Sequence, residues 1–240
     1  MNPTETPYVI ARELTDISDE LRAVPAPSTP ALPAPFDIRT ADADGADAEL
    51  LTEWMNRPHL VQTWEQPWPL ELRRQNLRAQ LLGSYSRPYI IGYDFTAAGR
   101  PELGRRDIAY LELYRPAKDE IARIYHADPY DVAFHLATAD PEVIGRGIMY
   151  SFVAGLLAGV FEAEPHCRRM VIEPDHRNVA VRRMTERFGV PNLGDFDIRP
   201  DRRITLYYLP RTPADRGHHS PSGGQIRQYG PAEEVGHSHL

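Results

Sequence analysis

"FHLATADPEVIGRGIMYSF" (residues 134–152) joins an apolar strand to a long apolar helix through a turn with two glycines. Its first part alternates like a buried strand, and "IMYSFVAGLLAGVFEA" (148–163) has helical spacing. Backbone N–H groups in such a turn and at the following helix N-terminus form an anion site suited to a pyrophosphate. Gly145 and Gly147 let the backbone approach the anion, and Arg146 adds a positive charge. Taken alone the motif is weak, because a strand-to-helix turn can need two glycines for its geometry.

Two polar side chains interrupt the apolar strands on either side of this helix. His135 shares its strand face with the small residues Ala133 and Ala137, which leave space beside the imidazole. Glu173 ends the next apolar run, "RRMVIE" (168–173). If the two strands are neighbours, both groups open into one cleft at the carboxyl edge of the sheet, where α/β sheets bind ligands. The plain alternatives are a core histidine with satisfied hydrogen bonds and a glutamate that caps the next turn.

The pattern around this stretch predicts one mixed α/β (α+β) domain over residues 36–211. A charged segment at 117–127 is also expected to be helical. Periodicity and Gly/Pro boundaries predict strands at 36–41, 88–95, 107–116, 130–139, 168–173, 194–199 and 202–209, and helices at 48–57, 69–84, 148–163 and 177–189.

Both ends of the chain differ in composition from this domain. Residues 1–35 are predicted to be an N-terminal extension, in which residues 8–22 have helical spacing. The segment "AVPAPSTPALPAP" (23–35) carries five prolines and is expected to be an extended linker. Residues 212–240 are too poor in apolar side chains to bury a core, so we expect a disordered tail. Its histidines are irregularly spaced, and we predict no metal site.

Composition limits the possible function classes. The formal charge of −7 argues against nucleic acid as the main partner, because phosphate binding requires clustered basic residues. Cys167 is the single cysteine, which excludes an internal disulfide and a cysteine-based metal site. No stretch approaches the roughly 18 apolar residues of a membrane-spanning helix, and the N-terminus lacks the pattern of a secretory signal. We therefore expect a cytoplasmic protein with no membrane partner.

The segment "IGRGIM" (144–149) resembles the acyl-CoA-binding motif of the GNAT N-acyltransferases, usually written Q/R-x-x-G-x-G/A. Downstream, "NVAVRRMTERFG" (178–189) is similar to the second cofactor segment of that family, and the element order is similar as well. The resemblance implies a central mixed, mostly antiparallel sheet of about seven strands, splayed between strands four and five and flanked by helices. The cofactor-binding residues that it implies are Ile144, Gly145, Arg146, Gly147, Ile148, Met149 and Asn178.

Three residues depart from the general GNAT pattern. Ile144 replaces a polar residue of the motif, and Met149 replaces its final small residue. Thr185 stands where many members carry a tyrosine that protonates the leaving thiolate. That proton must then come from another group, or none is required.

A narrower resemblance points to the siderophore branch of the family, which contains the lysine N-acyltransferases of mycobactin biosynthesis and, more distantly, aerobactin-type hydroxylysine acetyltransferases. The similar segments are "EWMNRPHLVQTWEQPWP" (53–69), "YLELYRPAKDEIARIYHADPYDVAFH" (110–135) and "CRRMVIEPDHRN" (167–178). The resemblance implies His135 and Glu173 as the active-site pair, the mycobactin enzymes having aspartate at the second position. It also implies an acyl-CoA or acyl carrier protein thioester as donor and a lysine-type amine or hydroxylamine as acceptor.

The chemistry of this pair agrees with acyl transfer to nitrogen. A lysine-type amine must lose a proton to attack, and histidine or a desolvated glutamate is a workable base. In the segment 53–69, His59 and Trp64 are candidates for the wall of the acceptor pocket, although aromatic packing explains such a loop equally well. The alternatives are acetylation of another small amine, an antibiotic or a protein, and a non-catalytic module that binds an acyl thioester.

Overall fold

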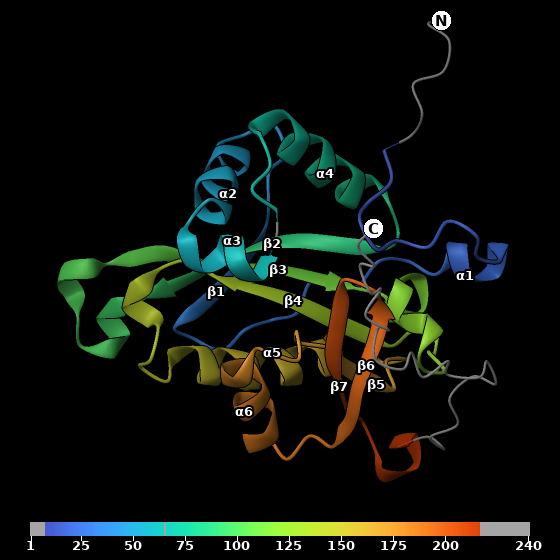
Figure 1. Cartoon of the computed structure of the whole chain (residues 1–240). Helices are drawn as coiled ribbons and strands as arrows, with labels where there is room; N and C mark the ends of the chain where they lie inside the picture. Colours follow the sequence, from blue (N-terminus) through green and yellow to red (C-terminus); the bar gives the residue numbers. More distant parts are fainter. Residues whose placement is uncertain (1–7, 65, 217–240) are drawn as a thin grey trace, which may run out of the picture.

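In the computed structural model, which describes residues 8–64 and 66–216, one seven-stranded sheet forms the centre of the molecule (Figure 1). The strand order is β1-β2-β3-β4-β5-β7-β6, and every pair is antiparallel except β4 and β5. The strands are β1 (Phe36–Thr40), β2 (Ser86–Asp94), β3 (Arg105–Tyr114), β4 (Val132–Thr138), β5 (Arg169–Ile172), β6 (Asn192–Arg199) and β7 (Arg202–Pro210). This confirms the predicted fold.

Helices cover both faces of the sheet (Figure 1). The helices α2 (Asp47–Met55), α3 (Pro58–Trp64) and α4 (Leu70–Leu82) lie on one face, where their apolar side chains pack with Ile90, Tyr110 and Ala137. On the other face, α5 (Ile148–Ala163) and α6 (Val179–Arg187) pack over the main core, which contains Leu111, Phe134 and Ile172. Because side chains alternate along β4, Ala133, His135 and Ala137 lie on the face covered by α2–α4. The sequence predicted that these three residues share a face.

The strands β4 and β5 separate soon after they meet. Their ladder contains only two residue pairs, Val132 with Met170 and Ala133 with Val171. Beyond Ala133, β4 has β3 as its partner on one edge only, because β5 ends at Ile172 and diverges. The predicted splay is thus present, and it leaves an open edge of backbone at His135.

The N-terminal extension packs against the domain along much of its length. A methyl group added at Gly159 of α5 would lie 2.2 Å from the carbonyl oxygen of Ala31, so helix and extension touch backbone to backbone. The buried ammonium of Lys118 donates to the carbonyl oxygens of Arg22, Val24 and Ser84 at 2.5–3.2 Å. Burial lowers the pKa of Lys118 to about 8. These contacts hold the proline-rich segment on the domain.

Three local predictions differ from the structure. The segment 117–127 contains two short 3₁₀ helices, η3 (Pro116–Lys118) and η4 (Glu120–Arg123), instead of one α-helix, because its charges point inward. In residues 8–22 only the start of α1 (Asp19–Ala23) is helical, since Glu13 forms a β-bridge with Asp119 instead. The supposed aromatic loop after residue 57 contains the helix α3. The tail predicted as disordered begins at 212, but residues 213–216 form the 3₁₀ helix η6, held by a hydrogen bond from Arg168 to Asp215 at 2.8 Å; the rest of the tail, beyond 216, lies outside the described residues.

The remaining short elements are 3₁₀ helices at the ends of strands. They are η1 (Phe95–Ala98), η2 (Pro101–Leu103), η5 (Pro141–Val143) and η6 (Pro213–Arg216). Of these, η5 leads from β4 into the glycine turn before α5.

Candidate active site

His135 and Glu173 meet where β4 and β5 separate. Because Ala133 and Val171 are a register pair, the residues two positions further along each strand point to the same face of the sheet. The Nε2 atom of His135 lies 2.7 Å from Oε1 of Glu173, and both side chains are largely withdrawn from solvent. The sequence prediction that these two groups lie together on one face at the splay is therefore confirmed by the geometry.

Glu173 is held as a carboxylate by three neighbours besides the imidazole. Tyr114 donates its hydroxyl to Oε1 at 2.8 Å, and Arg202 of β7 donates Nη2–H to Oε2 at 2.5 Å. The guanidinium of Arg12 lies 3.9 Å from Oε1. Burial opposes ionisation of this carboxyl, but the charge of Arg202 and the contact with His135 outweigh it and hold the pKa of Glu173 far below its usual range.

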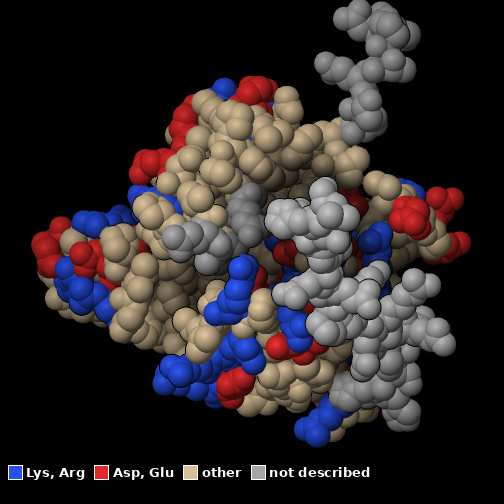
Figure 2. Space-filling view, in the orientation of Figure 1, with Lys and Arg blue, Asp and Glu red and all other residues tan. Residues whose placement is uncertain are grey.

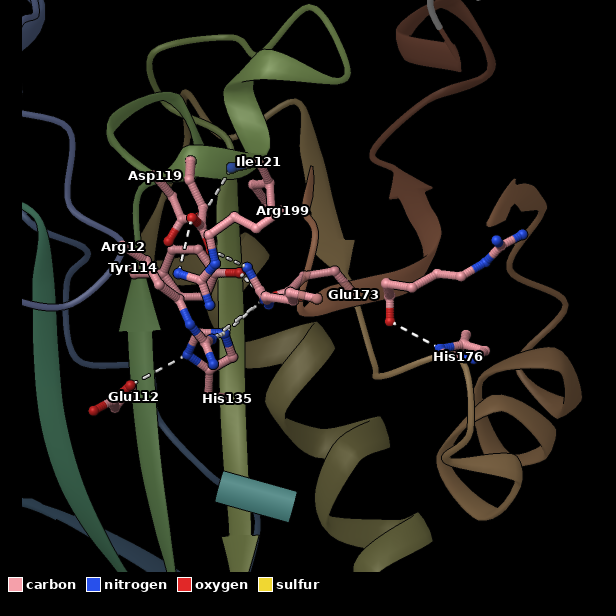
Figure 3. Close-up of polar contacts among 12 residues, drawn as sticks. Arg12, Glu112, Tyr114, Asp119, Ile121, His135, Glu173, His176 and Arg199 are labelled. Atoms are coloured by element: carbon pink, nitrogen blue, oxygen red, sulfur yellow. Dashed lines mark hydrogen bonds and ion pairs between the residues drawn. The ribbon is translucent and has the colours of Figure 1, made fainter. Parts of the chain in front are cut away.

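The imidazole of His135 lies between two carboxylates (Figure 3). Its Nδ1 atom is 3.2 Å from Oε2 of Glu112, opposite to the contact with Glu173. The ring of Tyr114 stacks on it, with ring centroids 4.5 Å apart. Burial and the positive charge of Arg12 disfavour the imidazolium, but the hydrogen bonds to Glu112 and Glu173 outweigh them and raise the pKa of His135.

Arg12 reaches this pair from the N-terminal extension. Its Nη1 atom lies 2.8 Å from Nε2 of His135. Its backbone has φ of 74°, a left-handed conformation that is rare for arginine, and its carbonyl accepts a hydrogen bond from the N–H of Glu120 at 3.0 Å. The adjacent bridge between Glu13 and Asp119 fixes the segment beside the cleft.

The structure separates the two residues predicted for the acceptor pocket. Trp64, at the end of α3, packs edge-on against the His135 ring at 6.1 Å and also contacts Tyr110, so it borders the site. His59, at the start of the same helix, lies at the end of β4, where its Nε2 atom is 3.1 Å from the carbonyl oxygen of Thr138. The helix thus runs alongside β4, and of the two predicted residues Trp64 lies next to His135 whereas His59 lies next to Thr138.

The glycine turn before α5 presents unpaired backbone donors. Gly145 and Gly147 have φ of 72° and 77°, and a methyl group added at either would meet nothing within 4 Å. In the described part of the chain, the five N–H groups from Gly145 to Met149 have no acceptor. Ile148 and Met149 pack their side chains on the core, whereas Ile144 is exposed. An anion at this turn would therefore meet backbone, not side chains.

The remaining predicted residues of the donor side have local partners. Arg146 is exposed and lies 3.3 Å from Glu142. Asn178 caps α6, because its Oδ1 atom accepts from the N–H of Val181 at 3.2 Å. Thr185 is buried and donates to the carbonyl of Val181, so its hydroxyl serves the helix. Burial raises the pKa of Cys167 to about 12, which argues against a thiolate nucleophile.

Sequence reasoning missed several members of this cluster. Glu112 carries a signal, because it interrupts the apolar strand "DIAYLELY" on the same face as Tyr110 and Tyr114. Arg12 carries none, since nothing in its surroundings along the chain indicates a contact 123 residues away. Arg202 lies in a strand with ordinary alternation, and its partners Glu120 and Glu173 emerge only from the fold.

The face with the cleft combines acidic and basic side chains (Figure 2). Basic groups gather over α5 and α6, where Arg183 and Arg187 are exposed one turn apart. Among the described residues, no group of three or more His, Cys, Asp or Glu side chains is placed to hold a metal ion. No helix in that part of the chain has the length and apolarity needed to cross a membrane.

Comparison with known proteins agrees with this geometry. Residues 44–198 match the family described as Acetyltransferase (GNAT) domain. The chain is 48% identical to lysine N-acyltransferase MbtK of Mycobacterium sp. (strain MCS), over 96% of this chain and 88% of that protein. It is 30% identical to the N(6)-hydroxylysine O-acetyltransferase of Escherichia coli, over 72% of this chain and 50% of that protein.

Solved structures share the fold. The aminoglycoside acetyltransferase AAC(6')-Ib in complex with coenzyme A superposes with a TM-score of 0.59 at 20% identity, covering 73% of this chain and 95% of that one. Spermidine N-acetyltransferase from Vibrio cholerae gives 0.55 at 14% identity, covering 74% and 96%. The chain is therefore an acyltransferase of the GNAT family and belongs to the branch that contains the lysine N-acyltransferases MbtK.

Proposed function

We propose that this enzyme transfers an acyl group from a thioester to the side-chain nitrogen of lysine or of a related hydroxylated diamine, for a hydroxamate siderophore. The observation that carries the proposal is the contact of 2.7 Å between His135 and Glu173 at the splay. It places a base and a fixed carboxylate on one side of an open strand edge. The 48% sequence identity to lysine N-acyltransferase MbtK supports the choice of acceptor.

The donor thioester enters from the α5 and α6 side in this proposal. Its pyrophosphate or phosphate accepts hydrogen bonds from the free N–H groups between Gly145 and Met149. Coenzyme A and an acyl carrier protein both present a phosphopantetheine arm, so the turn and Asn178 serve either donor. Arg183 and Arg187 are both exposed on α6, and such a pair of basic side chains suits an acidic carrier protein.

The acceptor lies on the α2–α4 side, beside Trp64 and His135. To attack, the ammonium must lose a proton, and His135 accepts it at Nε2 while Glu173 orients the incoming nitrogen. A hydroxylamine is much less basic, so for that acceptor the pair mainly orients the nucleophile.

The bond changes follow from these positions. The nitrogen lone pair adds to the thioester carbonyl, and the oxyanion that forms accepts a hydrogen bond from the unpaired edge of β4 beyond Ala133. The added nitrogen then loses its second proton to His135, whose first proton has passed to solvent, and collapse of the intermediate forms the amide and expels the thiolate. The proton taken by His135 neutralises the thiolate or passes to solvent, which accounts for the absence of a tyrosine at Thr185.

An assay with matched donors and acceptors tests the proposal. Acetyl-, succinyl- and long-chain acyl-CoA, and the same acyl groups on a carrier protein, are compared against lysine, N-hydroxylysine, ornithine and cadaverine. We expect turnover on a lysine-type acceptor that falls at least 100-fold in His135→Ala and Glu173→Gln. Turnover confined to antibiotic or protein amines, or unchanged rates in both variants, would contradict it.

A second experiment tests whether the donor is acyl-CoA or an acyl carrier protein. Reversing the two charges in Arg183→Glu/Arg187→Glu is expected to weaken transfer from the carrier protein and to leave transfer from acyl-CoA nearly unchanged. Unchanged transfer from both donors in this variant would exclude these two arginines from binding a carrier protein.

A further inference from the structure

We propose that Glu112 is a positioning residue that keeps the proton of neutral His135 on Nδ1 and leaves Nε2 as the base. The inference rests on the proposed role of His135 and adds to it a second carboxylate with a separate task. Glu173 would face the substrate, whereas Glu112 would act only through the imidazole.

Glu112 is built into the sheet directly across from His135. The two are register partners in the antiparallel pair of β3 and β4, so their side chains stand next to each other on the α2–α4 face. The Oε1 atom of Glu112 accepts from Nε2 of Gln80 at 2.8 Å and from the hydroxyl of Tyr110 at 2.9 Å. Its Oε2 atom is thereby directed to Nδ1 of His135 at 3.2 Å (Figure 3).

Glu112 is charged in this environment. Burial opposes its ionisation, but the hydrogen bond with His135, the charge of the imidazolium and the donors Gln80 and Tyr110 outweigh it and lower the pKa of Glu112. A carboxylate without its proton only accepts hydrogen bonds. The atom that faces it, Nδ1, must therefore carry the proton.

The contacts at Nε2 lead to the same assignment. A guanidinium only donates, so Nε2 must be unprotonated when it accepts from Arg12 at 2.8 Å. Nε2 carries a proton when it donates to Glu173 at 2.7 Å. These contacts describe the neutral and the protonated ring, and Nδ1 is protonated in both. The proton taken from the substrate nitrogen therefore has one destination.

The charged groups around His135 have distinct positions. Glu112 on β3 faces Nδ1, whereas Glu173 after β5 and Arg12 of the extension face Nε2. Tyr114 stacks on the ring, and the pKa of its hydroxyl is raised by burial and by Glu173, so it stays a neutral donor. Arg202 contacts Glu173, and Asp119 interacts electrostatically with His135. Of these groups, only Glu112 contacts Nδ1 in the described residues.

Glu112→Gln removes this charge while keeping the size of the side chain. Without the anion, the imidazolium loses stability, so the pKa of His135 falls and the ascending limb of kcat/KM against pH moves to lower pH. Because the charged ring forms during attack, we expect kcat at the plateau to fall about 10- to 100-fold, with KM values for both substrates changed less than threefold. The inference would be overturned if the ascending limb of kcat/KM stayed at the same pH, or if only KM changed.

Glu164→Gln is the matched control. Glu164 is also a buried carboxylate, but it pairs with Arg115 at 2.8 Å and accepts from the N–H of Ser28, away from the cleft. This variant is expected to lose stability and to keep both the limb and kcat. If the ascending limb of kcat/KM shifted as far in Glu164→Gln as in Glu112→Gln, the shift would result from losing any buried charge and the inference would be overturned.

The tautomer can be read without a substitution. In the unmodified chain labelled with ¹⁵N-histidine, we expect the His135 signals above the limb to report a protonated Nδ1 and an unprotonated Nε2, assigned by comparison with His135→Ala. The opposite tautomer would overturn the inference. If His135→Ala keeps full turnover, the proposed function fails instead, so the two failures are distinguishable.

Discussion

The Nη1 atom of Arg12 lies 2.8 Å from Nε2 of His135, although 123 residues separate them in the chain. The cation opposes protonation of the imidazole, because its charge lowers the pKa that Glu112 and Glu173 raise. Arg12→Met removes the charge and keeps an apolar stem. We expect the ascending limb of kcat/KM against pH to move to higher pH, opposite in sign to the shift in Glu112→Gln.

Arg22→Met is the control for this pH profile, because Arg22 belongs to the same extension but donates to the carbonyls of Thr15 and Ile17. The ascending limb of kcat/KM in Arg22→Met should lie at the same pH as in the unmodified enzyme. If the two variants give the same profile, the contact of Arg12 with the imidazole does not influence its ionisation.

Glu173 links stability to pH. Its folded pKa is depressed, so its contribution is complete above the ordinary pKa near 4.5 and is lost as pH falls through the folded value. Glu173→Gln removes one of the two carboxylates that contact the buried Arg202 and leaves Glu120 as the other, which should cost roughly 3 kcal/mol at pH 7. Urea unfolding should show that the loss of unfolding free energy in Glu173→Gln is smaller at pH 3 than at pH 7. The control Glu49→Gln, at an exposed position, should have nearly the unfolding free energy of the unmodified protein at both pH values.

Asp119 should behave in the opposite way. Burial and the nearby charge of Glu173 raise its pKa to about 6, so folding favours its protonated form, and its ionisation costs stability as pH rises above about 4. Asp119→Asn keeps an oxygen for the N–H of Ile121 and removes the charge. We expect a gain of roughly 1–3 kcal/mol at pH 8 that disappears near pH 4. Thermal unfolding across this range measures it, and a loss at pH 8 would contradict the assigned shift.

The contact between α5 and the proline-rich segment can be tested at Gly159. Because a methyl group there would meet the backbone oxygen of Ala31 at 2.2 Å, Gly159→Ala should destabilise the protein by about 1–3 kcal/mol. It should also speed proteolysis within residues 23–35. Ser151→Ala, at an exposed position of the same helix, should do neither. An unchanged melting temperature in Gly159→Ala would mean that the segment does not pack on α5.

Gly147 and Gly99 form a matched pair for the donor site. Both have positive φ, and a methyl group at either would meet open space, so each alanine variant should lose about 1 kcal/mol of stability from backbone strain alone. Only Gly147 precedes α5 and its free N–H groups. We therefore expect a raised KM for acyl-CoA in Gly147→Ala and an unchanged one in Gly99→Ala. Equal KM values would exclude this turn from donor binding.

The sequence predicted those parts of the site that depend on a strand and its immediate end. His135 and Glu173 are each polar in an apolar run, strand alternation predicts their common face, and the family resemblance implies their role as a pair. The helix predicted at 117–127 was wrong because its charges are satisfied by distant groups, such as Arg202 on Glu120. Arg12 was not found for the same reason, since tertiary contacts place it and no local pattern encodes them.

Lys118 is the only lysine in the chain, and its amine is buried under the carbonyl oxygens that hold the extension. An activated acyl group carried by this enzyme consequently meets no exposed lysine of its own polypeptide. Self-modification at lysine would require the extension to detach first. Acylation of Lys118 would thus indicate that the segment had unfolded, because the amine is not accessible to acyl groups in the folded enzyme.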